Sequence, residues 1–402
     1  MSFEIALSGI SAINSSLDTI SNNIANSGTY GFKSSRANFS AMYAGTQPTG
    51  AQIGSLTQSI GKGGGVLTTG GNLDATIQGR GFFIAKDSTG AEVYTRVGIF
   101  ATDKDGYLID SNGRKVQGYK AVVDAAGVPV AGAALGALGD LKVPSGQVAA
   151  QASSKLQYVG NLSADWTTPT VTPFNATDPL SYNSSLVSVA YDSLGVQHTV
   201  TQYFAKTASN NITVNYTFDG TAVATTTPLV FGTDGQLTTP VAAVPLALGT
   251  PSGANALSVD INYAGTTQFA GNTTTTVNAA NGYTSGALTG VKLSPDGSVM
   301  AQYSNGQKQR VGTVALATFA NENALVPMND TSWTASNASG TPLYSNPGTG
   351  MTGDLTVGSI EQSNVDMTSE LVSLMSTSRN YQANTKVIST ESDMMKSLMQ
   401  VI

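Results

Sequence analysis

The chain has no cysteine among its 402 residues and a single histidine, His198. Without cysteine there are no disulfides, no thiolate metal sites and no thiol nucleophiles. Without a second histidine or a cysteine, a metal site or a catalytic triad built on His198 is not expected, and a partly exposed strand histidine is the better interpretation. The sequence therefore predicts no catalytic, cofactor-binding or metal-binding residue, and we expect no enzyme activity and no cofactor.

Charge is scarce as well. Charged residues make up 11% of the chain, against roughly 25% in typical soluble domains, which favours packed, repetitive surfaces over enzyme clefts and a small-molecule substrate. The formal net charge is −6 and the sequence contains no basic run, so nucleic acid is not expected as a partner, because phosphate binding needs clustered cations.

Long apolar runs are also missing. No stretch approaches the ~18 consecutive apolar residues of a membrane span. The first residues include Glu4 and Asp18 and no cation before Lys33, unlike a secretory signal peptide. These signals alone predict a cytosolic protein.

What the chain does have is helix-period apolar spacing at both ends. Apolar residues that recur at heptad spacing predict coiled-coil-like helices. Near the N-terminus the heptad residues are Phe3, Ala6, Ile10, Ile13, Leu17, Ile20 and Ile24. Near the C-terminus the apolar stripe comprises Met367, Leu371, Leu374, Tyr381, Ile388, Met395, Met399 and Ile402. We expect the first helix to end near Asn26-Ser27-Gly28, and the last to begin after Asp366 as N-cap with Glu370 in its first turn.

Neither terminal helix is expected to be stable on its own. Burying the large apolar side chains of the first heptad series yields on the order of 10 kcal/mol, whereas ordering roughly 25 residues costs 1–2 kcal/mol for each residue. Isolated helices of this length are marginal in water. These residues are therefore predicted to pack between subunits of a polymer; the alternative is an intramolecular two-helix hairpin that closes a domain.

Between the ends the period changes to two. Alternation at residues 212–218 and 257–263, together with Asp-Gly pairs at 105–106, 219–220, 234–235 and 296–297, predicts antiparallel strands joined by hairpin turns. The expected fold class is mainly β with α-helical termini that flank nested antiparallel β-domains.

A composition shift subdivides this body, because Lys155 and Lys206 are the only cations between residues 147 and 282. We expect a terminal helical polymerisation domain of residues 1–45 and 357–402, a Gly-rich linker or extended arm of residues 46–71, a discontinuous β-domain of residues 72–146 and 283–356, and an inserted β-domain of residues 147–282.

Two segments carry a family resemblance. The N-terminal signature, residues 22–33, reads Asn-Asn-Ile-Ala-Asn-Ser-Gly-Thr-Tyr-Gly-Phe-Lys; the C-terminal signature comprises residues 363–371 and Arg-Asn-Tyr-Gln-Ala-Asn at 379–384. Both resemble the signatures of the bacterial flagellar rod and hook proteins. The matching residues are Asn22, Asn23, Asn26, Tyr30, Gly31, Phe32 and Lys33, and Asn364, Val365, Asp366, Arg379, Asn380 and Tyr381.

Within this family the chain is most similar to the hook members, which Gly79-Arg80-Gly81-Phe82-Phe83 and Ala317-Thr318-Phe319-Ala320-Asn321 also resemble. The resemblance implies a curved tubular homopolymer that acts as a universal joint, with terminal helices inside, a middle β-layer and the inserted domain outside. It implies export through the flagellar type III apparatus without a cleaved signal peptide, and as partners the distal rod protein, the hook cap and the hook-filament junction proteins. The alternatives are a distal rod or junction protein of the same family, and a secreted β-rich adhesin or carbohydrate-binding module.

Overall fold

The computed structural model describes residues 2–122, 136–144 and 146–401. The chain forms two compact units. The first unit comprises Met1–Ser145, Gly290–Gln302 and Lys308–Ile402, and the second comprises Gly146–Thr289 and Tyr303–Gln307.

Both chain ends are helical, which confirms the two helices that the heptad patterns predict. Helix α1 spans Ser2–Ala25 and helix α2 spans Met367–Val401. The carboxylate of Asp366 accepts hydrogen bonds from the backbone N–H groups of Thr368 and Ser369 at 3.0 and 3.3 Å, so Asp366 is the N-cap of α2. These backbone donors hold the pKa of Asp366 below its ordinary value. In the described part of the chain, neither helix combines the length and apolarity that crossing a membrane requires.

A long antiparallel hairpin follows α1, where part of the Gly-rich stretch was expected to be a linker or an extended arm. Strand β1 (Ser35–Ala44) pairs with β2 (Gln47–Gln58) in a two-stranded sheet. The end of β2 is fixed to the β-body, because Trp333 donates from Nε1 to Gln58 Oε1 at 2.8 Å and Ile60 is buried in the core. The sequence did not reveal this pairing, because both strands are largely exposed and so carry no regular alternation of apolar and polar residues.

The β-body of the first unit is built on a 13-stranded sheet, with the main path β20-β21-β22-β9-β5-β6-β25-β24. Its strands are β5 (Phe82–Lys86), β6 (Glu92–Thr95), β7 (Phe100–Thr102), β8 (Leu108–Asp110), β9 (Lys115–Lys120), β10 (Leu138–Asp140), β20 (Leu288–Leu293), β21 (Ser298–Tyr303), β22 (Lys308–Val314), β23 (Leu316–Thr318), β24 (Val326–Met328), β25 (Ser332–Thr334) and β26 (Leu343–Ser345). A short 3₁₀ helix, Glu322–Ala324, lies between β23 and β24. Phe82 makes edge contacts with Phe319 and Trp333 in the core.

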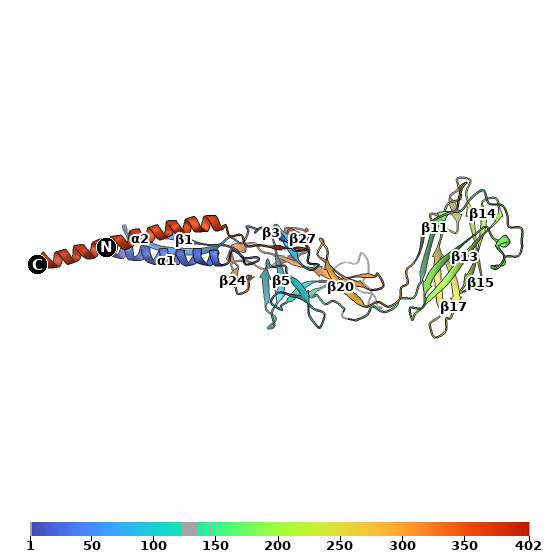
Figure 1. Cartoon of the computed structure of the whole chain (residues 1–402), viewed down its shortest axis with the longest axis horizontal. Coiled ribbons are helices and arrows are strands. Elements are labelled where there is room, and N and C mark those ends of the chain that lie inside the picture. The colour runs from blue at the N-terminus through green and yellow to red at the C-terminus, as the bar shows by residue number, and fades with distance from the viewer. Residues whose placement is uncertain (1, 123–135, 145, 402) are drawn as a thin grey trace. The chain divides into compact units, whose positions relative to one another are not determined.

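Two small sheets join the sequence before this body to the sequence after it. Strand β3 (Val66–Thr68) pairs with β28 (Ser359–Glu361), and β4 (Ala75–Gln78) pairs with β27 (Asp354–Val357), both antiparallel. Strand pairing thus joins the segment that follows the β1–β2 hairpin to the segment that leads into α2 (Figure 1).

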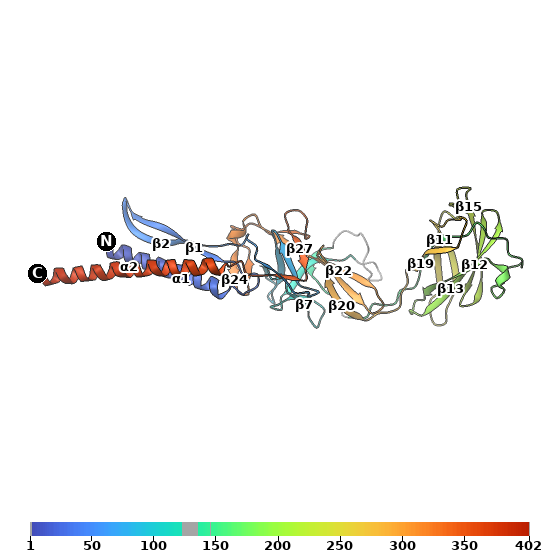
Figure 2. The same cartoon turned by 45° about the horizontal axis from the view of Figure 1, so that its top comes forward.

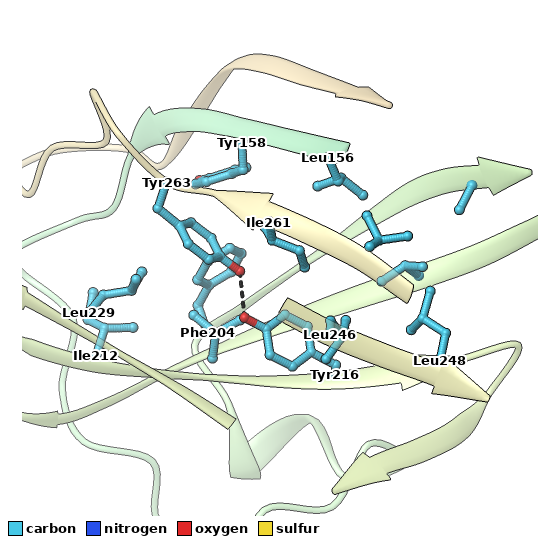
Figure 3. Packing of buried hydrophobic residues seen from close by; sticks show 14 of the residues in the cluster. Leu156, Tyr158, Phe204, Ile212, Tyr216, Leu229, Leu246, Leu248, Ile261 and Tyr263 are labelled. Carbon is cyan, nitrogen blue, oxygen red and sulfur yellow. Dashed lines mark hydrogen bonds between the residues drawn. The ribbon is translucent and has the colours of Figure 1, made fainter. Parts of the chain in front are cut away.

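The second unit contains two sheets around one core. A four-stranded sheet has the order β17-β18-β11-β19 and a five-stranded sheet the order β12-β13-β14-β15-β16. The strands are β11 (Lys155–Asn161), β12 (Ser184–Tyr191), β13 (Gln197–Ala208), β14 (Asn211–Phe218), β15 (Thr221–Phe231), β16 (Leu237–Thr239), β17 (Val244–Gly249), β18 (Leu257–Asn262) and β19 (Thr274–Ala280), with a 3₁₀ helix at Pro179–Ser181. Tyr216 of β14 and Tyr263, the residue directly after β18, meet through their hydroxyls at 2.8 Å inside the core (Figure 3).

The predicted alternation and turns are confirmed with one exception. Ile212, Val214 and Tyr216 are buried on one face of β14. The Asp-Gly pairs end in glycines with positive φ, for example +81° at Gly220. The exception is the pairing of β11 with β18, which is parallel. Their connection contains the whole five-stranded sheet and not a tight turn, so nothing forces an antiparallel arrangement.

Candidate functional site

The two terminal helices pack against each other within the first unit, and the β1–β2 hairpin packs on α1 (Figures 1 and 2). This is the intramolecular arrangement that the heptads alone left open. It covers only part of the predicted packing surface. On α1, Ala6, Ile13 and Ile20 are buried, whereas Ile10, Leu17 and Ile24 are half-buried and Phe3 is exposed.

Helix α2 buries even less of its stripe. Leu374 and Ile388 are half-buried, and these two residues face the same side of the helix at heptad spacing. The remaining described members are exposed, namely Met367, Leu371, Tyr381, Met395 and Met399. Ile402 lies outside the described residues. Because water-exposed apolar residues at regular helical spacing are typical of contact surfaces, this uncovered area is the first part of the candidate site.

The second part is the junction at which the two signatures meet. Asn23 connects three elements from the end of α1. Its side-chain amide accepts from Ser35 N at 2.9 Å, and it donates to Ser35 O at 2.8 Å and to Glu370 Oε1 at 3.0 Å. One buried amide thereby fixes α1 to the start of β1 and to the first turn of α2.

Asn364 does the same from the other end of the chain. Its side chain accepts from Ser34 N at 2.7 Å and donates to Ser59 O and Lys62 O at 3.0 and 2.9 Å. Its backbone N–H donates to Phe32 O at 3.2 Å. With every polar atom of the amide satisfied, the cost of burying it is offset and the loop geometry is fixed.

A buried ion cluster completes the junction. Lys33 Nζ donates to Glu361 Oε1 at 2.5 Å and to Lys62 O at 2.8 Å, and Gly64 N donates to the same carboxylate oxygen at 2.9 Å. Arg96 Nη1 lies 3.7 Å from Glu361 Oε2. Burial lowers the pKa of Lys33, and the neighbouring Glu361 carboxylate partly opposes this. Burial likewise lowers the pKa of Arg96.

Gly31 carries the close approach that the junction needs. It has φ +67°, and a β-carbon at this position would lie 2.8 Å from Val97 Cγ2. Its N–H donates to Glu361 O at 2.9 Å. A glycine is therefore required here both by backbone conformation and by space.

The other signature residues make local contacts or are exposed. Asn22 and Asn26 close the last turn of α1, where Asn26 donates from its backbone and its side chain to Asn22 O at 3.0 Å. Tyr30 is exposed and Val365 is half-buried. Arg379, Asn380 and Tyr381 are exposed on α2 and are not part of the junction.

Sequence reasoning missed Glu361 and Arg96, which are central to the junction. Neither lies in a signature, and Glu361 is 328 residues from Lys33. The available signal was weak: no acidic residue lies between Asp18 and Asp74, so a buried Lys33 needs an acidic partner from elsewhere in the chain.

The described residues hold no group of three or more His, Asp or Glu side chains arranged to bind a metal ion. His198 lies half-buried on β13, between the carboxylates of Asp219 and Asp192 at 2.6 and 3.3 Å.

Four family models match four separate stretches that together make up more than two thirds of the chain. They are "Flagella basal body rod protein" at residues 3–33, "Flagellar hook protein FlgE/F/G D1 domain" at 76–157, "Flagellar basal body protein FlaE D2 domain" at 161–283 and "Flagellar basal body rod FlgEFG protein C-terminal" at 356–401.

Full-length relatives agree with these matches. The chain is 35% identical to the flagellar hook protein FlgE of Escherichia coli K12 and 36% identical to that of Salmonella typhimurium LT2, in both cases over 100% of either chain. It is 31% identical to the flagellar hook protein FlgE of Treponema pallidum over 98% of each chain. The crystal structure of Helicobacter pylori flagellar hook protein FlgE2 shares the fold, with a TM-score of 0.55 at 13% identity, over 74% of this chain and 100% of that one. This chain therefore belongs to the flagellar hook protein family.

Proposed function

We propose that this chain is the structural subunit of a bacterial flagellar hook, a curved tubular homopolymer that transmits torque as a universal joint. The observation that carries the proposal is the incomplete burial of the two helical stripes in a chain whose full-length relatives are hook proteins. In the polymer, neighbouring copies of the chain cover the apolar faces of α1 and α2 that are exposed in a single copy.

The inserted unit separates the hook proposal from the rod alternative. Residues 161–283 match a family domain that lies within a compact unit of its own, with its own core. The rod proteins of the family that this chain resembles usually lack so large an insert. In the polymer we assign the terminal helices to the inner wall, the β-body of the first unit to the middle and the inserted unit to the outside.

The proposed partners are further copies of the chain, the distal rod protein, the hook cap and the hook-filament junction proteins. The flagellar type III apparatus is proposed to export the chain without removal of a signal peptide. We propose no catalytic role and no small-molecule substrate.

Location in the cell tests this proposal. Flagella sheared from the source bacterium are labelled with gold-conjugated antibody against residues 147–282 and viewed by negative-stain electron microscopy. Gold is expected on the short curved segment between rod and filament, and a strain lacking the chain is expected to make no filament. Label on the rod or at the hook-filament boundary alone would favour the same-family alternatives.

A further inference from the structure

A groove lies between α1, the β1–β2 hairpin and α2, and encloses about 580 Å³. Its apolar lining comes from Ile5 and Ile13 of α1, from Phe39, Pro48 and Ala51 of the hairpin and from Ala383 of α2. Asn380 and Asn384 also line it, and no lining residue is charged. A groove of this volume and chemistry suits an apolar ridge of a partner protein.

The matching ridge is on α2 itself. Met394, Met395, Leu398 and Met399 are 54–78% exposed and form one continuous apolar strip. Residues three or four apart are neighbours on a helix surface, and this spacing joins Met394 to Leu398, Leu398 to Met395, and Met395 to Met399. This part of α2 continues past the N-terminus of α1 in both views (Figures 1 and 2). Methionine side chains are flexible and fill irregular grooves well. We call these four residues the α2 ridge.

The ridge cannot fill the groove of its own chain. Helix α2 is unbroken from Met367 to Val401, and 14 residues at 1.5 Å each place Leu398 about 21 Å along the axis from Asn384. If the α2 ridge fills the groove, it must therefore come from a second copy of the chain.

We propose that the α2 ridge of one copy docks in the groove formed by α1, the hairpin and α2 of the next copy. The inference rests on the proposed polymerisation and names the two surfaces that carry it. Ridge and groove are different surfaces of the same molecule, so their contact is heterologous and leaves a free ridge and a free groove after every addition. Contacts of this kind build rings or open helical polymers and not two-fold symmetric dimers, and an open helix is the form that the proposed tube requires.

Cysteine cross-linking tests the contact directly, because the native chain has no cysteine. Ala51→Cys and Leu398→Cys are introduced together, tubes are assembled under reducing conditions and then oxidised, and the product is run on a denaturing gel. A ladder of covalent multimers is expected from tubes, and no cross-link from dilute monomer, because a disulfide needs α-carbons within about 7 Å. The matched control joins Ala51→Cys with Val241→Cys, a 91% exposed residue of the second unit, and is expected to give no ladder.

A second pair, Phe39→Cys with Met394→Cys, repeats the test with other side chains. Assembled tubes that give no ladder with either pair would overturn the proposal, as would an equal ladder from the Val241 control or cross-linking of Leu398→Cys alone, which indicates a ridge-to-ridge contact. Failure of the unmodified chain to form tubes would instead contradict the proposed function.

An assembly measurement covers the case in which the cysteine variants polymerise poorly. Leu398→Asp is expected to raise the critical concentration for assembly at least tenfold, since it places a charge in an apolar groove. Val241→Asp is expected to leave that concentration unchanged. An unchanged critical concentration for Leu398→Asp would overturn the proposal.

Discussion

Lys33 and Glu361 form a fully buried ion pair, with 2.5 Å between Nζ and Oε1, although 328 residues separate them in the sequence. The pair lies where the segment after α1 meets the segment before α2. It therefore ties the segment that follows α1 to the segment that precedes α2.

Removing one partner of this pair is expected to be costly. Glu361→Gln or Lys33→Met leaves the other group charged and buried, which costs about 3–5 kcal/mol. Urea unfolding followed by tryptophan fluorescence measures the loss in a Trp166→Phe background, because Trp333 then reports on the first unit alone. The control is Lys396→Met, which breaks an exposed pair with Asp393 and is expected to change stability little. A loss of less than about 1 kcal/mol for both junction variants would contradict a structural role for the pair.

Charges placed on the helix faces are expected to separate assembly from folding. Phe3→Asp changes an exposed residue and should abolish assembly while the monomer keeps its circular dichroism spectrum and melting temperature. Ile20→Lys changes a residue that is 8% exposed and packed within the chain, so it should lower the stability of the monomer itself by several kcal/mol. Leu17 is half-buried, so Leu17→Asp should partly impair assembly and partly lower the stability of the monomer.

Sedimentation and electron microscopy score assembly of these variants. Glu4→Gln is the control because it removes a charge from the same exposed turn without burying one. Normal tubes from Phe3→Asp would show that this face of α1 is not an assembly surface.

The single histidine is expected to make the stability of the second unit depend on pH. Burial disfavours the charged imidazole of His198, but hydrogen bonds to Asp219 and Asp192 outweigh it and raise the pKa above the ordinary value of 6.5. A raised folded-state pKa contributes stability that is fully present below the unfolded value and is lost as pH rises through the folded one. The thermal stability of the second unit should therefore fall as pH rises above about 6.5.

His198→Gln is expected to remove this part of the pH dependence. Proton NMR measures the titration without ambiguity, because the chain has one imidazole. A measured pKa at or below 6.5, or an unchanged pH profile in His198→Gln, would contradict the ion-pair account.

Deleting the inserted domain, residues 147–282, is expected to leave assembly intact but to alter curvature. The core of the second unit draws all its buried residues from 156–263, so the deletion takes nothing from the core of the first unit. A bending tube needs outer contacts that are weak and individually replaceable. A Gly-Ser splice should therefore give straight or abnormally flexible tubes and impaired motility, measured by electron microscopy and swarming. Complete failure to assemble, with the first unit folded, would contradict the assignment.

The parts of the fold that depend on local pattern could be predicted from the sequence. The heptads located both helices, the Asp366 cap located the start of α2, and the alternation at residues 212–218 located the buried face of β14. The contacts between distant segments could not, because neither the Lys33–Glu361 pair nor the parallel pairing of β11 with β18 leaves a periodic trace.

The hairpin was missed for a related reason. Phe39, Tyr43 and Leu56 are exposed in the chain, so burial within one molecule does not impose a clear alternation on β1 and β2. Which of the predicted contact residues meet another copy is set by the polymer, and remains a prediction from the exposed faces of α1 and α2.

The central claim is that copies of this chain polymerise through their helical ends. The most direct measurement is negative-stain electron microscopy of the purified chain at rising concentration, beside a variant lacking residues 2–25, the span of α1. The account predicts hollow tubes from the full chain, and from the variant a β-rich monomer that does not assemble at any concentration. Tubes formed equally well without α1, or a full chain that stays monomeric at the highest concentration reached, would contradict it.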